Sequence, residues 1–122
     1  MHRVYLTFDD EVFCEALRNT FQTHGDFIVC GEAKNDIQVL KELMKLTPSL
    51  VVMEIQLPPW ERFQIAEALK IILPEVPLFL VTEQDVIQRV EKMALSGGID
   101  AVFAKGDDVT SLVDNARAVL EA

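Results

Sequence analysis

The sequence predicts a single α/β domain in which helices cover both faces of a parallel sheet. Five short apolar runs alternate along the 122 residues with five longer segments whose apolar residues recur at helical spacing. Continuous apolar runs are typical of strands that are buried on both faces, and strands that alternate with helices indicate βαβ units. The expected architecture is therefore one doubly wound, three-layer (βα)5 domain.

The strands are predicted where the apolar runs lie. The third run, Leu-Val-Val-Met-Glu-Ile, is too short for a helix, and Pro48 and Pro58 bracket it. Glu54 stands near its end, and burial of a carboxylate is costly unless the group is paired or reaches solvent. We therefore expect Glu54 at the carboxyl edge of the sheet. The predicted strands cover residues 3–8, 27–33, 50–55, 77–82 and 101–104.

The helices are predicted between and after these strands. Aspartate is preferred at helix starts, whereas glycine and proline mark helix ends. With these signals the helices are expected at 11–24, ended by Gly25; from Asp36, with Ile37, Leu40, Leu43 and Met44 facing inward; at 61–73, closed by Pro74; over 86–94, ended by Gly97 and Gly98; and after Asp107 or Asp108 through Leu120.

Composition argues against several functions. The chain has 20 acidic residues against 11 lysines and arginines, and a formal net charge of −9 disfavours contact with nucleic acid or an anionic membrane by this domain. There is no secretory signal pattern and no apolar stretch of membrane-spanning length. Cys14 and Cys30 lack metal-ligand spacing and are expected to be buried, reduced thiols of a cytoplasmic protein. Because no glycine-rich loop follows the first strand, dinucleotide and P-loop sites are disfavoured.

Polar residues stand at the ends of four predicted strands: Asp9 and Asp10, Glu54, Thr82, and Lys105. In a parallel sheet of order 2-1-3-4-5 these ends meet at one edge, with the third strand between the first and the fourth. Clustered carboxylates repel one another, so the site implies either a bound Mg²⁺, with both aspartates and the glutamate as ligands, or pairing with the lysine. Taken singly, one aspartate could cap the first helix and the threonine could cap the fourth.

These motifs resemble those of the receiver domains of bacterial two-component response regulators, over essentially the whole chain. The resemblance implies a flavodoxin-like, CheY-like fold of sheet order 2-1-3-4-5, with residues 1–122 as one receiver domain. The segment Gly31-Glu32-Ala33 is similar to the branch whose receivers precede helix-turn-helix DNA-binding domains. The segments that carry the resemblance are Phe8-Asp9-Asp10, residues 52–58, Val81-Thr82 and Lys105.

The resemblance also implies a role for each site residue. In the family, an aspartate at the position of Glu54 takes a phosphoryl group from a histidine kinase. The acidic pair, Asp9 and Asp10, holds Mg²⁺ together with that carboxylate. Lys105 and Thr82 correspond to the groups that bind the phosphoryl oxygens.

Two departures concern the chemistry of the site. Glu54 is one methylene longer than aspartate, and a misplacement of ~1 Å can cost ~10²-fold in rate. The longer side chain could instead carry negative charge toward Lys105 and Thr82, in imitation of a phosphorylated aspartate, or form a relic pair with Lys105. Glu83 places a bulky anion where the family usually has a small residue. We therefore predict a degenerate receiver.

Two further departures concern signal transmission. Val102 stands three residues before Lys105, where the family has a switch aromatic, and strand alternation is expected to turn the neighbouring Phe103 to the other face of the sheet. Pro59 and Trp60 stand where the family commonly has glycine and aspartate, which stiffens the loop and adds a large apolar side chain beside the site.

The leading hypothesis is a non-enzymatic signalling module that acts through protein contacts. The expected partners are a histidine kinase, an output domain or other regulators, including a second copy of the chain, and a DNA-binding output domain would follow Ala122. An alternative is a working phosphoacceptor that uses Asp9 or Asp10 with Mg²⁺. Another is a small-molecule sensor with an apolar crevice under Trp60. The contact surface would be formed by the fourth helix, fifth strand and fifth helix, with Ile87, Val90, Val102 and Leu112 as apolar candidates, most of which are expected to lie in the core.

Overall fold

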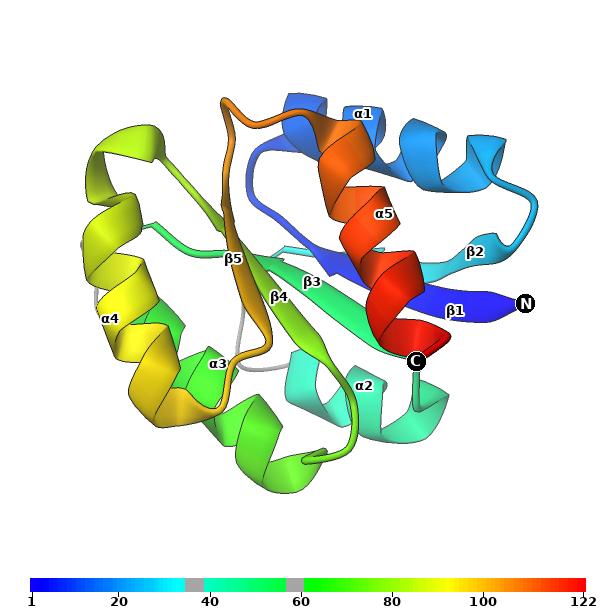
Figure 1. The fold of residues 1–122 in the computed structure, drawn as a ribbon. Coiled ribbons are helices and arrows are strands. Elements are labelled where there is room, and N and C mark those ends of the chain that lie inside the picture. The colour runs from blue at the N-terminus through cyan, green and yellow to red at the C-terminus, as the bar shows by residue number, and fades with distance from the viewer. Residues whose placement is uncertain (35–38, 57–60) are drawn as a thin grey trace.

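Five parallel strands form one sheet in the computed structural model, which describes residues 1–34, 39–56 and 61–122. The strand order is β2-β1-β3-β4-β5, as predicted. Figure 1 shows the sheet with its helices. The elements are β1 (His2–Thr7), α1 (Glu11–Thr23), β2 (Phe27–Ala33), α2 (Val39–Leu46), β3 (Leu50–Glu54), α3 (Glu61–Ile72), β4 (Leu78–Thr82), the 3₁₀ turn η1 (Gln84–Val86), α4 (Ile87–Gly97), β5 (Ala101–Ala104) and α5 (Val109–Leu120).

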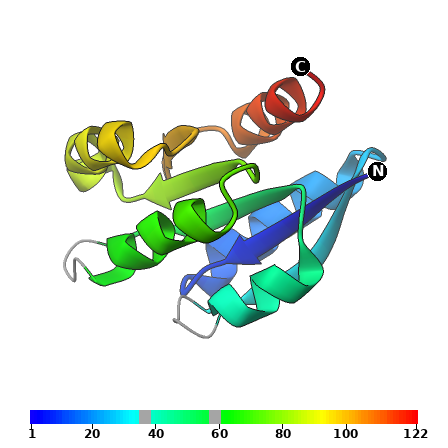
Figure 2. The same ribbon diagram turned by 90° about the horizontal axis from the view of Figure 1, so that it is seen from below.

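Each face of the sheet has its own apolar core. Residues of α1 and α5 pack on one face, and residues of α2, α3 and α4 pack on the other (Figure 2). Strand alternation divides β3 between the two cores: Leu50 and Val52 belong to the first, Val51 and Met53 to the second. The molecule is therefore the three-layer, doubly wound α/β domain that the sequence predicts.

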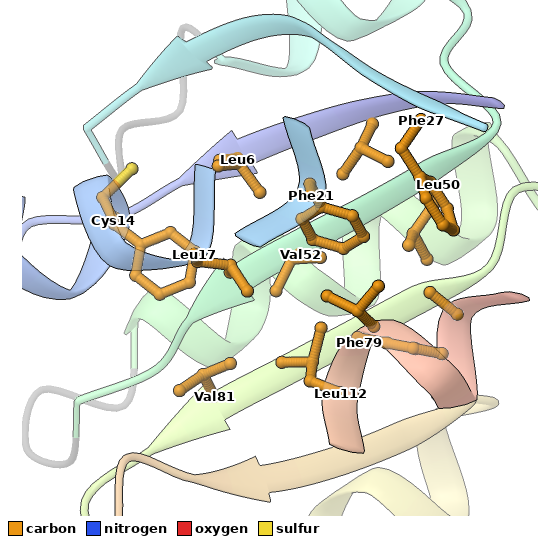
Figure 3. Packing of buried hydrophobic residues seen from close by; sticks show 14 residues of the cluster. Leu6, Cys14, Leu17, Phe21, Phe27, Leu50, Val52, Phe79, Val81 and Leu112 are labelled. Carbon is orange, nitrogen blue, oxygen red and sulfur yellow. The ribbon is translucent and has the colours of Figure 1, made fainter. Parts of the chain in front are cut away.

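The core beneath α1 and α5 anchors the two helices that begin beside the site. Figure 3 shows Leu17 and Phe21 of α1 and Leu112 of α5 lying over Val52 and Phe79 of the central strands. All five side chains are buried, and burial of each contributes roughly 1.5–3 kcal/mol relative to exposure. This packing fixes α1 and α5 against the same face of the sheet.

The two central strands, β3 and β4, offer no exposed position to a charged side chain. Every residue of β3 and β4 is buried, whereas the edge strands β2 and β5 are partly exposed. Because all four neighbouring pairs are parallel, the carboxyl ends of the strands lie at one edge of the sheet. A polar residue of β3 or β4 therefore reaches other polar groups at that edge.

Several element ends differ from the sequence prediction. The bounds of β2 and β5 agree, whereas β1, β3 and β4 differ by one residue at one or both ends. The helix α1 ends before Gly25, because His24 already has an extended backbone and serves as its C-cap. Gly98 ends α4 in the left-handed conformation, with φ of 72°, as predicted. Of the two candidates for the start of α5, Asp108 is the N-cap.

The predicted apolar face of α2 is wrong at one position. Met44 is 56% exposed, whereas Val39 and Leu43 are buried. The two buried residues are four positions apart and share one side of the helix, which turns Met44 away from the sheet. The predicted cap at Asp36 and the neighbouring Ile37 lie outside the described residues.

Two other expectations concern thiols and membranes. Both cysteines are free; Cys14 is buried, but Cys30 is only partly buried, so the prediction of burial was wrong for the second. Within the described ranges, no helix combines the length and the apolar character needed to cross a membrane.

Candidate functional site

Glu54 is the last residue of β3 and stands at the carboxyl edge of the sheet, as predicted. Its side chain is nevertheless fully buried, with 0% of its surface exposed. Oε1 accepts hydrogen bonds from the backbone N–H groups of Asp9 and Asp10, at N···O distances of 2.7 and 3.0 Å. The loop between β1 and α1 therefore covers the carboxylate and supplies two donors that offset its loss of hydration.

Lys105 directly follows β5 and supplies the counter-charge. Its Nζ lies 2.5 Å from Oε2 of Glu54, 2.9 Å from Oδ2 of Asp10 and 3.1 Å from Oε1 of Glu83. The lysine side chain is 13% exposed. An ammonium group has three N–H donors, and these three carboxylates are enough to accept all of them. We call these four residues the Lys105 cluster.

Charge pairing shifts the titration of this cluster. Burial by itself raises the pKa of Glu54, but hydrogen bonds from Lys105 and from the two backbone N–H groups outweigh burial, and the pKa lies below its usual value. Burial by itself lowers the pKa of Lys105, but hydrogen bonds to Glu54, Asp10 and Glu83 hold that pKa above its usual value. The buried glutamate and the lysine are therefore both charged at neutral pH.

Asp10 belongs to the site and to a helix start at once. Its Oδ1 accepts a hydrogen bond from the backbone N–H of Phe13 at 3.1 Å and so caps α1, while its Oδ2 contacts Lys105. The hydrogen bond from the lysine is the main reason that the pKa of Asp10 is lowered. Asp9 brings its backbone N–H to Glu54. Of the acidic pair, Asp10 is the residue whose side chain both caps the helix and joins the cluster.

Thr82 does not cap the fourth helix. Its side chain is fully buried, and its hydroxyl donates a 2.7 Å hydrogen bond to the backbone carbonyl of Ile55, one residue after the end of β3. A hydroxyl in this position ties β4 to the neighbouring strand. The predicted contact from Glu54 to Lys105 is present, whereas the hydroxyl of Thr82 is directed to the backbone.

Val102 and Phe103 face opposite sides of the sheet, as predicted. Val102 packs against the core beneath α2, α3 and α4, whereas Phe103 packs against the core beneath α1 and α5. The ring of Phe103 lies 5.3 Å from that of Phe79, with the two planes at 49°. The position that would carry a switch aromatic therefore holds a small aliphatic side chain, and the nearest aromatic is held in the other core.

The donor set of the site does not fit the ligand set expected for Mg²⁺. Of the three predicted ligands, Glu54 has Oε1 on two N–H groups and Oε2 on Lys105, and Asp10 has one oxygen on the cap and one on the same lysine. In the parts of the chain that the structure describes, no three His, Cys, Asp or Glu side chains are grouped as metal ligands. The pairing with Lys105, one of the two arrangements that the sequence left open, is present, and binding of Mg²⁺ stays a prediction.

Two features of the site region were not predicted from the sequence. The side-chain amide of Gln56 lies 3.3 Å from Oε2 of Glu54, and its position two residues further on was the available signal. Glu83 was predicted as an obstacle to phosphate, but its ion pair with Lys105 was not. Pro59 and Trp60 lie outside the described residues.

The surface of α4 and β5 carries a groove of about 280 Å³. Of the apolar candidates for this surface, Val90 and Leu112 are buried in the two cores, as was expected for most of the four candidates. Leu95, which the sequence reading overlooked, is 87% exposed and lies at the groove. The groove is lined by Glu91, Ala94, Leu95, Ile99, Asp100, Ala101 and Val102.

The fold and this edge of the sheet define a class of protein, the doubly wound signal receiver with an acidic pair, a strand-end carboxylate, a hydroxyl and a lysine at the carboxyl ends of its strands. The chain belongs to the response regulator receiver domain family, whose family model matches residues 4–117.

Comparison with known proteins supports the same assignment. The chain is 27% identical over 120 residues to the uncharacterized transcriptional regulatory protein YvcP of Bacillus subtilis, covering 98% of this chain and 49% of that protein. It is 30% identical over 107 residues to protein-glutamate methylesterase/protein-glutamine glutaminase 1 of Syntrophus aciditrophicus, covering 86% of this chain and 30% of that protein. The chain therefore spans about half, or less, of the length of these curated relatives.

A solved structure has the same fold over nearly the whole chain. The LuxR-family two-component response regulator of Aurantimonas sp. SI85-9A1 matches with a TM-score of 0.86 and 21% sequence identity, covering 99% of this chain and 86% of that one. At this identity the likeness concerns the fold alone.

Proposed function

We propose that this domain is a degenerate receiver that does not use aspartyl phosphorylation and that acts, without enzymatic activity of its own, through protein contacts in the cytoplasm. The observation that carries the proposal is the pairing of Glu54. Its carboxylate is fully buried and lies against two backbone N–H groups and Lys105. Lys105, which would contact a phosphoryl group in a phosphorylated receiver, is therefore already paired with a carboxylate.

Two chemical arguments support the absence of phosphorylation. The oxygens of Glu54 already accept hydrogen bonds from two backbone N–H groups and contact Lys105, so their lone pairs are not directed to an incoming phosphorus atom. A phosphoryl group would also need the N–H donors of Lys105, and Asp10, Glu54 and Glu83 lie in position to accept all three. The extra methylene of Glu54, which misplaces the carboxylate relative to an aspartate, is a further obstacle to phosphorylation.

Intact-mass spectrometry after incubation with acetyl phosphate and Mg²⁺ tests this proposal. We expect no phosphorylated species from the wild-type chain under conditions that fully label a conventional receiver run beside it. Labelling of the wild type that is lost in Asp9→Asn or Asp10→Asn, and kept in Glu54→Gln, would instead establish an aspartate of the acidic pair as the acceptor. Labelling lost only in Glu54→Gln would show that Glu54 itself reacts. The first result would overturn the proposed absence of aspartyl phosphorylation, and the second would overturn the proposal that the receiver is degenerate.

For the protein contact we propose the α4–β5 groove, with a second copy of the chain as its occupant. Leu95 offers an exposed apolar side chain at the groove, and Glu91 gives the groove an acidic side, whereas the carboxylate of Asp100 is paired with Lys70. Arg89 and Lys92 are exposed on the same helix. In a two-fold symmetric pair, the basic residues of one α4 would face the acidic side of the other groove.

Replacing Leu95 with aspartate is expected to weaken self-association, because it puts a charge into the apolar centre of the proposed contact. The measurement is the dissociation constant of the dimer by sedimentation equilibrium. Val12→Asp is the matched control, since Val12 is 81% exposed on α1 and lies away from the groove. A wild-type chain that is monomeric at all concentrations, or equal loss in both variants, would contradict the proposed surface.

We further propose that the domain regulates an output domain elsewhere in the natural protein. The name of the B. subtilis relative describes a transcriptional regulatory protein, and the structural neighbour from Aurantimonas is a LuxR-family regulator. A net charge of −9 makes this domain a poor ligand for DNA, so DNA contact would belong to the output domain. Chromatin immunoprecipitation with the full-length protein would test this, and absence of any enriched site would contradict it.

A further inference from the structure

We infer that Lys105 is the resident cation of this site and that it excludes Mg²⁺ from the acidic pocket. Receivers of this family are expected to hold Mg²⁺ with the acidic pair and the strand-end carboxylate. In this chain the ammonium group of Lys105 takes the place of the metal between Asp10 and Glu54. The inference concerns cation binding and stands independently of the proposed function.

The acceptor positions of Glu54 are already in use. A carboxylate oxygen has two lone pairs. Oε1 accepts from the N–H groups of Asp9 and Asp10, and Oε2 lies 2.5 Å from Lys105 and 3.3 Å from the amide nitrogen of Gln56. Among the described residues, these four donors already match the four acceptor positions of this buried side chain. A metal could bind Glu54 only by displacing one of them.

Lys105 also occupies the position that a metal ion would take. Nζ of Lys105 lies 2.9 Å from Asp10 and 2.5 Å from Glu54, so it occupies the space between the two carboxylates that a bridging metal ion would need. Mg²⁺ requires near-octahedral oxygen ligands at about 2.0–2.1 Å and gives up water reluctantly. A divalent ion inserted beside the ammonium group would also meet like charge in a poorly hydrated site, because the lysine side chain is only 13% exposed.

The negative charge that Lys105 does not neutralise lies toward solvent. Three carboxylates around one ammonium group leave an excess of negative charge, but it lies on the solvent side: the side chains of Asp10 and Glu83 are 35% and 56% exposed. Water and dissolved salt screen charges in such positions. The excess therefore attracts cations diffusely, without a defined coordination site.

The test is a calorimetric titration with MgCl₂, and a melting curve in MgCl₂ against NaCl of equal ionic strength. Three proteins are compared: the wild type, Lys105→Met and Lys70→Met. The lysine at position 70 is a matched control, because it is also 13% exposed and pairs with one carboxylate, that of Asp100, away from the site. Lys105→Gln replaces Lys105→Met if the latter does not fold, since the amide keeps a donor for Glu54 without the charge.

We expect no saturable Mg²⁺ binding by the wild type or by Lys70→Met. Removing the charge of Lys105 should create a site, with a Kd at least about tenfold below any value measurable for the wild type, and a rise in melting temperature that is specific to Mg²⁺. Saturable millimolar or tighter binding by the wild type would overturn the inference. So would failure of the folded Lys105 variant to gain binding, since Lys105 would then not be what excludes the metal.

Discussion

Replacing Lys105 with methionine is expected to lower the free energy of unfolding by about 3–5 kcal/mol, because it leaves a fully buried carboxylate without a counter-charge. Methionine keeps most of the aliphatic packing of the lysine, so the loss reports on the charge. Urea denaturation at neutral pH measures the effect. Lys70→Met should cost about 1 kcal/mol or less, because its partner Asp100 is partly exposed to solvent.

The double variant Glu54→Gln/Lys105→Met separates pairing from packing. If the loss comes from an unpaired charge, removing the charge of Glu54 as well should restore most of it, since the backbone N–H groups of Asp9 and Asp10 can still donate to the amide oxygen. A double variant no more stable than Lys105→Met would contradict the ion-pair account.

The pH dependence of the same variants has a defined sign. The pKa of Glu54 is lower in the folded than in the unfolded state, so its contribution is present above the unfolded value of about 4.3 and is lost as pH falls. The pKa of Lys105 is raised, so its contribution is present below the unfolded value of about 10.4 and is lost as pH rises through the folded value. The stability gap between wild type and Lys105→Met should therefore be widest between about pH 5 and pH 10. A gap that stays constant down to pH 3 would contradict this.

Glu54→Asp combined with Glu83→Ala is expected to accept a phosphoryl group from acetyl phosphate, at a rate at least ~10²-fold above the slowest labelling that the measurement would detect in the wild type. The aspartate withdraws the carboxylate by one C–C bond, about 1.5 Å, and so releases it from Lys105. Removing Glu83 frees a further donor of the same ammonium group. Time-resolved intact-mass spectrometry in the presence of Mg²⁺ measures the rate.

The single variants show how the two obstacles combine. Glu54→Asp alone should label more slowly than the double variant, and Glu83→Ala alone should not label. Glu83 is 56% exposed, so its removal is expected to change stability little. Equal rates for Glu54→Asp and the double variant would show that Glu83 is no obstacle. No labelling of the double variant would show that the site differs from a working receiver in more than these two residues.

The fold could be predicted because its signals are local. The continuous apolar run of β3 and the alternation of strands with helical segments define a parallel sheet before any contact is known. The ends of helices were harder to predict, because each end depends on the backbone conformation of one residue. Gly98 takes the left-handed conformation that its residue type suggests, whereas α1 stops at His24 for a reason that its sequence does not signal.

The membership of the site could be predicted for a similar reason. Residues at the carboxyl ends of neighbouring parallel strands must lie close together, so Glu54, Asp10 and Lys105 were expected at one edge. Their pairing could not be predicted, because either a cation from solution or the ammonium group of Lys105 can neutralise the repulsion between the clustered carboxylates.

The sequence by itself determined a doubly wound receiver fold and the residues that meet at the carboxyl edge of its sheet. Only the tertiary structure decided how they use their oxygens and N–H groups: Lys105 reaches three carboxylates, while the hydroxyl of Thr82 turns to the carbonyl of Ile55. The physical reason is that strand order and register set where a side chain begins, whereas its partner depends on distances of a few ångströms between groups far apart in the chain, over which hydrogen bonds form or fail.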